Sequence, residues 1–526
     1  MVEGERSLTV TVRQRGALRG PKACAAADHP LAAQAGMAVL QRGGSAADAA
    51  VAMGAVMVVV QPYYSHLGGD LFALTFDART REVEALNSSG PTPASAAVAA
   101  YRALGSIPAE GGLAVTVPGC VDGWWQLHRR AGRLPWAELL EPATAYARDG
   151  FPASRQLAAF LGAAADKVRP REYFNRLFGH VSRGGARVTQ PELGRTLGDI
   201  AAGGADAFYG GEVARACREW LVGQGAAFSA EDWRGPARWE RPVSAPFAGA
   251  TVFSQPPPSQ GFVLPLALKL YVELLDGRSG LADCVLQHAA LAQAFQLRAT
   301  YAGDPDTTGF DAQRLIDDTH LGSLITPGAP VPAGDGDTTY LLAIDAQGNA
   351  VSLIQSLFAG WGSGVLVPGT GVIMNNRMCG FTLREGHPNV LAPGKRPMHT
   401  LHSYIATGPE GELRVVGGTP GAMQQPQTNL AVLDAILRRG MDVQDALDEP
   451  RWSMGAFAPF RPDYREVLVE RHSPDLFSPA FRDAEVDVED CDSWTASMGR
   501  AYVAVVDEGG IAAASDVRGE GLAIVM

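Results

Sequence analysis

The sequence has little positive charge for its length. Its 526 residues contain 44 Lys and Arg against 56 Asp and Glu, which gives a formal net charge of −12. No block rich in Lys or Arg interrupts this acidic balance. Because a protein that binds phosphate backbones needs a basic surface, no nucleic-acid partner is expected.

The sequence also lacks metal-binding and phosphate-binding motifs. No two of its six cysteines are close enough for a C-x-x-C pair, so they are predicted to be buried free thiols in a reducing compartment. His399 and His402 lie on a predicted loop-to-strand segment without an H-E-x-x-H pattern. The turn at 417–422 lacks the Gly-Lys-Ser/Thr of a Walker loop, although its N–H groups suit an anion. Neither a metal nor a cofactor is therefore expected.

Long apolar runs and a leader are missing as well. The most apolar run, Ala49 to Val60, is too short to span a bilayer and predicts a buried helix. The first residues, Met-Val-Glu-Gly-Glu-Arg, have no basic stretch followed by an apolar one. A cytoplasmic protein without a membrane partner is expected.

The composition that remains is that of an ordinary globular protein. Hydrophobic residues make up 46% and charged residues 19% of the chain, enough for a sizeable core. The length allows two to four domains or one large α/β unit. A Ser-His-Asp hydrolase is disfavoured because no G-x-S-x-G nucleophile elbow is present.

The stretch from 327 to 357 gives the strongest indication of function. Two β-type runs, Thr338 to Asp345 and Ala350 to Leu357, flank a short turn containing Gly and Asn and predict a hairpin. A segment rich in Gly and Pro, 327–336, comes directly before it. One interpretation is a linker followed by a strand. The other is self-cleavage, in which the Thr338 hydroxyl attacks the preceding peptide bond and the freed α-amine then acts as its base.

The residues that follow favour self-cleavage. The blocks Asp-x-x-Gly-Asn-Ala-Val, 361–364 and 371–376 come in one order and spacing. With the Thr-Thr start at 338, they resemble the γ-glutamyltransferase family. The resemblance extends over nearly the whole chain, from helices expected at Pro30–Arg42 and from Ser45 to Val60 onward.

This resemblance implies a fold and a precursor. The fold is a four-layer αββα N-terminal-nucleophile hydrolase sandwich, an α/β arrangement of two antiparallel sheets between helical layers. The implied cut lies between Asp337 and Thr338. A large subunit, 1–337, with a helical region at about 153–325, would stay associated with a small subunit, 338–526, which carries the nucleophile.

By family position, four residues carry the chemistry. Thr338 is the nucleophile, and Ser356 supplies a second hydroxyl that hydrogen-bonds it. The N–H groups of Gly421 and Ala422 stabilise the oxyanion, which requires a small side chain at 422.

The substrate anchors of the family differ here. Its carboxylate-binding Arg is missing around Ser89, because no Arg lies between Arg81 and Arg102. The family's Asn-Asn-Gln-Met-Asp-Asp-Phe reads Asn-Asn-Arg-Met-Cys-Gly-Phe and places Arg377 where an ammonium group would bind. The other positions assigned to the substrate pocket are Ser89 and the changed residues His399, Thr400 and Phe358.

These changes predict weak or absent γ-glutamyl transfer. The chain instead resembles the amidohydrolase and acylase branches of the family, such as oxamate amidohydrolases and cephalosporin acylases. Arg377 is expected to bind an acidic or carbonyl group of a small amide, or to serve as a structural ion-pair partner. A γ-glutamyltransferase or glutathione hydrolase, an unprocessed binding homologue, acyl transfer and a homo-oligomer stay open as alternatives.

Overall fold

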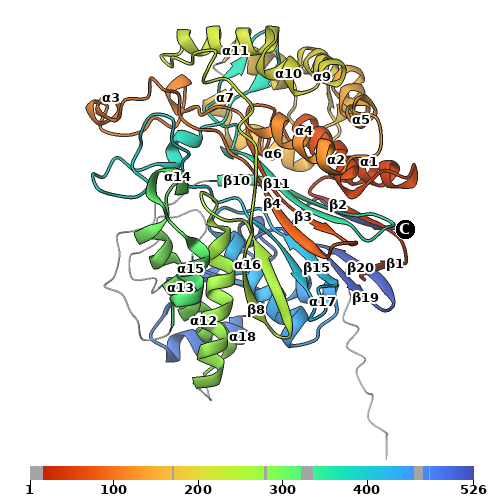
Figure 1. The fold of residues 1–526 in the computed structure, drawn as a ribbon, viewed down its shortest axis with the longest axis vertical. Helices are drawn as coiled ribbons and strands as arrows, with labels where there is room; N and C mark the ends of the chain where they lie inside the picture. The colour runs from red at the N-terminus through yellow and green to blue at the C-terminus, as the bar shows by residue number, and fades with distance from the viewer. Residues whose placement is uncertain (1–15, 169–170, 278–280, 321–335, 455–465, 473) are drawn as a thin grey trace, which may run out of the picture.

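The computed structural model describes residues 16–168, 171–277, 281–320, 336–454, 466–472 and 474–526. Two antiparallel seven-stranded sheets pack face to face between two helical layers (Figure 1). Sheet A has the order β1 (Leu18–Gly20), β20 (Gly510–Ser515), β19 (Tyr502–Asp507), β15 (Leu413–Gly418), β14 (Ser403–Thr407), β9 (Ala250–Ser254) and β8 (Val243–Phe247). Sheet B has the order β21 (Leu522–Val525), β2 (Cys24–Ala27), β10 (Gly336–Ile344), β11 (Ala350–Ala359), β3 (Asp70–Asp77), β4 (Glu82–Ser88) and β7 (Arg238–Glu240). The predicted αββα sandwich is therefore correct.

The two sheets share an apolar layer. Tyr340, Leu342 and Ile354 of sheet B pack with Ile405 and Val416 of sheet A, and all are buried. Alternation along the strands sends every second side chain to this layer.

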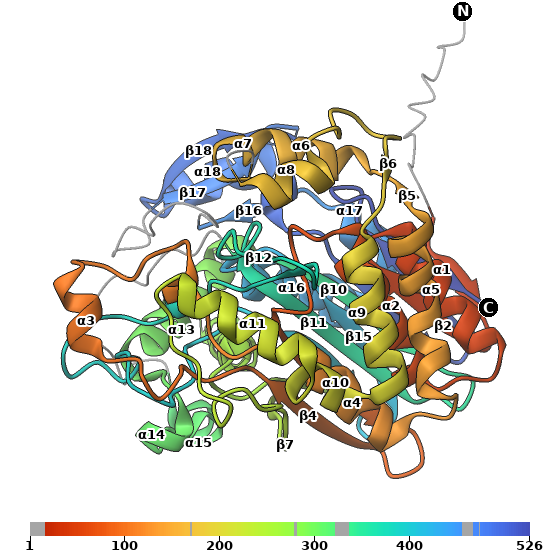
Figure 2. The same cartoon turned by 90° about the horizontal axis from the view of Figure 1, so that it is seen from above.

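Each sheet is covered on its outer face by helices. Over sheet B lie α1 (Pro30–Gln41), α2 (Ala46–Val60), α4 (Cys120–Ala131), α5 (Trp136–Asp149), α9 (Pro191–Gly203), α10 (Ala205–Tyr209) and α11 (Glu212–Gly223) (Figure 2). Over sheet A lie α12 (Val263–Gly277), α13 (Asp283–Tyr301), α15 (Ala312–Asp318), α16 (Gln424–Leu433), α17 (Val443–Asp448) and α18 (Pro474–Asp483). Shorter helices at the periphery are α3 (Val98–Ala103), α6 (Arg155–Ala163), α7 (Ala165–Val168), α8 (Glu172–Phe178) and α14 (Pro305–Thr308).

Two local predictions, the helix from Ser45 to Val60 and the hairpin that begins at Thr338, are confirmed. Helix α2 begins with a complete capping box, because the Ser45 side chain accepts from the Asp48 N–H and Asp48 accepts from the Ser45 N–H. Strands β10 and β11 form the predicted hairpin. Strands β14 and β15 pair, as do β19 and β20.

The expectation of a helical region throughout 153–325 is wrong for residues 238–254. Strand β7 lies there, followed by the β8–β9 hairpin at the edge of sheet A. Burial alternates along β8 and β9, which is the two-residue period of a strand. Ala248 and Gly249, at φ 47° and 77°, form the two-residue turn that such a hairpin favours.

The cysteine prediction is correct in part. All six are free, but Cys379 and Cys491 are only partly buried, unlike Cys24, Cys120, Cys217 and Cys284. Within the described ranges, every helix is too short or too polar to cross a bilayer. The cytoplasmic location stays a prediction, and most of the segment 327–336 lies outside the described residues.

Candidate active site

Thr338 lies at an irregular point of the β10–β11 ladder. The register pairs Asp337 with Phe358 and Thr339 with Gln355, and it shifts between Asp337 and Thr339. Thr338 is fully buried, and its Oγ1 has no hydrogen-bond partner in the described part of the chain. Leaving a buried hydroxyl unpaired costs free energy, so such groups merit a functional explanation.

The neighbouring threonine has a different environment. Thr339 Oγ1 donates a hydrogen bond to Gln61 Oε1 at 2.9 Å, at the end of α2. It thus faces the helical layer over sheet B, as alternation along the strand predicts for the residue after Thr338.

The turn after β15 presents two backbone donors. Gly421 and Ala422 have φ values of 126° and 49°, in the region that side chains disfavour. Neither N–H donates to any described residue. Gln260 links the turn to the segment before β14, because its Nε2 donates to Ala422 O at 2.9 Å and to Thr400 O at 2.8 Å. Adjacent N–H groups without acceptors can bind an anionic oxygen.

Ser356 lies on β11, next to the strand that carries Thr338. Its Oγ accepts a hydrogen bond from the Phe358 N–H at 2.8 Å, and it pairs across the sheet with Asp70 of β3. Phe358 has a φ of 86°, so this hydrogen bond stabilises a strained bend at the end of the strand.

Arg377 is a fully buried cation that is only partly paired. Its Nε contacts Asp70 Oδ2 at 3.2 Å, and its guanidinium lies 4.7 Å from the centre of the Phe358 ring. Nη1 and Nη2 have no hydrogen-bond partner among the described residues. Both alternatives for Arg377 thus have support, because one edge is anchored structurally while two donor groups remain available.

Burial shifts the pKa values of this pair. It lowers the pKa of Arg377 to about 10, against the attraction of Asp70. It raises the pKa of Asp70 to about 6, although Arg377 and the Gly90 N–H oppose the shift. The carboxylate is therefore mostly ionised at neutral pH and is close to taking up a proton below it.

His399 and Thr400 lie on the segment before β14. Burial, followed by the cations of Arg377 and Arg396, holds the pKa of His399 well below its ordinary value, so the ring is neutral. Neither ring nitrogen has a partner among the described residues, and the ring lies edge-on to Phe72 at 5.0 Å. Thr400 is buried, and its carbonyl accepts from Gln260.

Ser89 has a positioning role in the structure. Its hydroxyl donates to Asn87 Oδ1 at 2.6 Å, and its carbonyl accepts from Arg396 Nε at 3.1 Å. The next residue, Gly90, donates its N–H to Asp70 Oδ1 at 3.0 Å. The Ser89 hydroxyl is thus already paired, and the loop affects Arg377 indirectly, because the Gly90 N–H orients Asp70.

Two residues of this region were missed from the sequence. Asp70 is the first residue of β3 and directly follows Gly68-Gly69. Arg500 donates from Nη2 to the Thr338 carbonyl at 3.3 Å, although 162 positions separate them. The acidic residue directly after Gly68-Gly69 was a usable signal for Asp70, whereas the sequence near Arg500 offered none.

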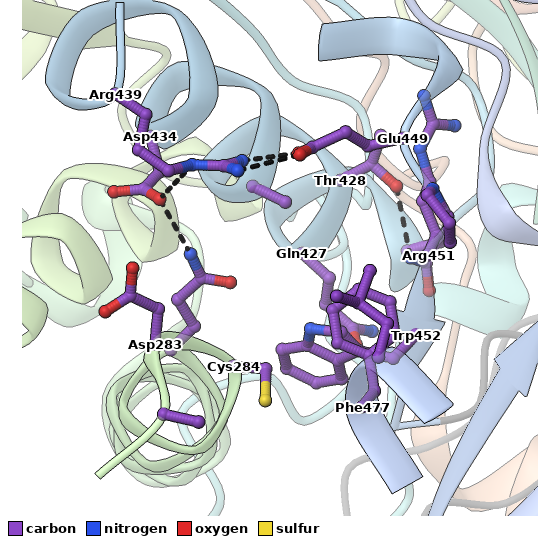
Figure 3. A pocket seen from close by; sticks show the side chains of 16 residues that line it. Asp283, Cys284, Gln427, Thr428, Asp434, Arg439, Glu449, Arg451, Trp452 and Phe477 are labelled. Carbon is purple, nitrogen blue, oxygen red and sulfur yellow. Dashed lines mark hydrogen bonds and ion pairs between the residues drawn. The ribbon is translucent and has the colours of Figure 1, made fainter. Parts of the chain in front are cut away.

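A separate cavity of about 270 Å³ lies between α13 and α16 (Figure 3). It contains none of the predicted site residues. Its charged groups pair with one another, since Arg439 contacts both Glu449 and Asp434, and Gln287 donates to Asp434 at 3.3 Å. The described residues also contain no group of three or more His, Cys, Asp or Glu arranged to hold a metal ion.

Comparisons with known proteins agree with this fold. The family profile described as gamma-glutamyltranspeptidase matches residues 32–526. The glutathione hydrolase-like YwrD proenzyme of Bacillus subtilis is 35% identical over 96% of this chain and 98% of its own. The oxamate amidohydrolase proenzyme of Klebsiella pneumoniae is 33% identical over 95% and 97%. The cephalosporin acylase of Bacillus halodurans superposes with a TM-score of 0.87 at 29% identity, covering 100% of this chain and 99% of its own. The chain belongs to the gamma-glutamyltranspeptidase family.

Proposed function

We propose that this chain is a self-processing amidohydrolase or acylase with Thr338 as its nucleophile. The observation that carries the proposal is the set of buried polar groups left without partners among the described residues. They are Thr338 Oγ1, Arg377 Nη1 and Nη2, both ring nitrogens of His399, and the N–H groups of Gly421 and Ala422. Related proenzymes and acylases in the family agree with this chemistry.

In the processing step, Thr338 Oγ1 attacks the carbonyl carbon of Asp337. The C–N bond breaks, the nitrogen becomes the α-amine of Thr338, and Asp337 is held as an ester. Water hydrolyses the ester and leaves a carboxylate on Asp337. The products are a large subunit, 1–337, and a small subunit, 338–526, which stay packed because β10 lies between β2 of one and β11 of the other.

In the catalytic step, the α-amine of Thr338 takes the hydroxyl proton while Oγ1 attacks the substrate carbonyl. An ordinary α-amine has a pKa of about 8, suitable for this transfer. The N–H groups of Gly421 and Ala422 bind the oxyanion. Collapse expels the amine, which receives the proton, and leaves an acyl ester. Water then attacks the ester, its proton passes through the α-amine to Oγ1 as the bond between the acyl carbon and Oγ1 breaks, and the carboxylic acid leaves. An amine in place of water gives acyl transfer.

The pocket chemistry favours an acidic or carbonyl-bearing amide. The fork of Arg377 suits bidentate pairing with a carboxylate. Neutral His399 adds a donor, and Phe358 adds an apolar face under the guanidinium. A γ-glutamyl substrate carries an α-ammonium group, which a buried cation repels. Oxamate, named for the Klebsiella relative, has an amide beside a carboxylate and fits these requirements.

The test is to substitute the nucleophile. Purified wild-type protein should give two fragments, the smaller beginning at Thr338 by mass spectrometry. Thr338→Ala should remain one chain without amidase activity, while Thr338→Ser, which keeps the hydroxyl, should still cut. An intact wild-type chain that hydrolyses amides would exclude this mechanism.

A substrate panel then separates the alternatives. Oxamate, a glutaryl amide and a γ-glutamyl chromogenic amide should be compared at equal concentration, by ammonia or amine release. Faster hydrolysis of the amides that lack an α-ammonium group is expected. Efficient γ-glutamyl release at micromolar KM would instead establish a γ-glutamyltransferase, and an uncut, inactive wild type would indicate a binding homologue.

A further inference from the structure

Arg500 connects two parts of the candidate site that are distant in sequence. Its Nη2 donates to the Thr338 carbonyl oxygen at 3.3 Å. Its own backbone N–H donates to Thr419 Oγ1 at 2.8 Å, two residues before Gly421. One residue therefore contacts both the strand that carries the hydroxyl and the turn that carries the oxyanion donors.

The Arg500 side chain is held from three directions. Its Nε and Nη2 donate to the two carboxylate oxygens of Asp28, each at 3.3 Å. Tyr502 donates its hydroxyl to Asp28 Oδ1 at 2.7 Å. The guanidinium also lies 4.7 Å from the centre of the Tyr64 ring. Because Asp28 is fully buried and Arg500 is 2% exposed, solvent screens this cluster little.

The turn beside Arg500 is closely packed. A Cβ on Gly499 would lie 2.8 Å from the hydroxyl oxygens of both Thr419 and Thr428. Arg451 Nη1 donates to the carbonyls of Met498 and Gly499, each at 3.1 Å. These contacts restrain the main chain that positions the Arg500 N–H. Because the side chain of the same residue bonds the Thr338 carbonyl, Arg500 can hold Thr338 at a set distance from Thr419.

We propose that Arg500 is a positioning residue that fixes Thr338 against the Gly421–Ala422 turn and whose cation keeps the freed α-amine of Thr338 neutral. The proposal rests on the role of Thr338 given above. The carbonyl oxygen and the nitrogen of one residue are separated by about 4 Å or less. Arg500 Nη2, which lies 3.3 Å from that oxygen, is therefore within about 7 Å of the amine, and a like charge at this range in a buried site disfavours protonation of the amine.

The surrounding charges set the sign of this effect. Asp28 offsets part of the Arg500 cation because it pairs with the same guanidinium. Burial raises the pKa of Asp28 and Glu520 adds to this rise, while Arg500 and Tyr502 oppose it. Burial holds the pKa of Tyr502 well above its ordinary value, so its hydroxyl is neutral at pH 7. Removal of Arg500 should therefore raise the pKa of the amine, and removal of the Asp28 charge should lower it.

The experiment needs no substrate. The α-amine of Thr338 in processed protein is labelled with an amine-reactive reagent at a series of pH values, and the labelled small subunit is quantified by mass spectrometry. Arg500→Met should shift the labelling midpoint upward by about one pH unit and slow self-cleavage. Arg500→Lys keeps the charge but not the fork, so its midpoint should match wild type while it cleaves several-fold more slowly. Asp28→Asn should shift the midpoint downward.

Arg133→Met is the matched control. Arg133 pairs with Asp345 at 3.2 Å, so it also joins the proposed large subunit to the same hairpin, but at the opposite end of β10. Its removal should change neither cleavage nor the midpoint. A merely structural role for Arg500 would slow cleavage without moving the midpoint.

Each outcome decides the proposal. Wild-type cleavage and midpoint in Arg500→Met would overturn it. If Arg500→Met does not fold, Arg500→Lys decides, and cleavage at the wild-type rate in that variant overturns the proposal. A wild-type protein that is never cut at Thr338 overturns the proposed function together with this inference. A wild type cut there, with unaffected Arg500 variants, overturns the inference alone.

Discussion

Two fully buried arginines, Arg518 and Arg377, show how differently this fold uses the same side chain. All guanidinium nitrogens of Arg518 donate. Nε bonds Glu470 at 2.8 Å, Nη1 bonds Leu447 O at 3.0 Å and Asp516 at 3.2 Å, and Nη2 bonds Glu449 O at 3.0 Å and contacts Glu470. Among the residues that the structure describes, Arg377 has a single ion pair, with Asp70.

The difference in pairing distinguishes an arginine that stabilises the fold from one whose free donors can bind a ligand. A buried charge whose donors are all satisfied contributes to the fold, and losing it leaves buried carboxylates uncompensated. Unpaired donors on a buried cation instead cost stability. The proposed binding role would explain why Arg377 retains them, whereas complete pairing assigns Arg518 to the scaffold.

The largest expected effect is on stability. Arg518→Met should lower the free energy of unfolding by about 3–5 kcal/mol, because the buried Glu470 carboxylate loses its partner and Asp516 keeps only Arg451. Arg377→Met should cost clearly less, because Asp70 can take up a proton. Melting temperatures in a Thr338→Ala background, in which every variant is one uncut chain, measure both. An equal fall in melting temperature in Arg518→Met and Arg377→Met would contradict the distinction between the two arginines.

The next effect is the pH dependence of stability. Burial raises the pKa of Asp70 to about 6, so its proton stabilises the fold fully below about pH 4 and this contribution is lost as pH rises through 6. The shift of about two pKa units corresponds to about 3 kcal/mol at most. The melting temperature of the wild type should therefore fall relative to that of Asp70→Asn as the pH rises from 4 to 7.

Asp516 provides the control of opposite sign. Although burial opposes it, Arg451 and Arg518 hold the pKa of Asp516 below its ordinary value. Its stabilisation is therefore present above about pH 4 and lost as pH falls further. Asp516→Asn should lose most stability near neutral pH, and matching profiles for the two variants would contradict the comparison.

The smallest expected effect is on catalysis. Arg377→Met should lower kcat/KM on an acidic amide about tenfold or more, since charge-assisted hydrogen bonds contribute about 1.5–3 kcal/mol. Self-cleavage should continue, because it uses Thr338 and its immediate neighbours. Arg377→Lys keeps the charge but not the planar fork, so its kcat/KM should lie between those of the wild type and Arg377→Met. An unchanged kcat/KM in processed Arg377→Met would leave Arg377 with a structural role alone.

Local patterns predicted much of the fold. The capping box at Ser45, the β10–β11 hairpin and the terminal β19–β20 hairpin each follow from contacts within a short stretch of chain. The β8–β9 hairpin did not emerge, because helical patterns on both sides of it dominated the segment. Its alternation spans only five residues in each strand.

The order of residues alone determined the family, the position of Thr338 and the Gly-rich turn at 417–422, because these depend on residue type and on spacing along the chain. Only the tertiary structure decided which polar groups pair. It joined Asp70 to Arg377 across 307 positions and Arg500 to Thr338 across 162. The reason is that hydrogen-bond satisfaction in a buried site depends on strands and loops that meet only after the two sheets have packed.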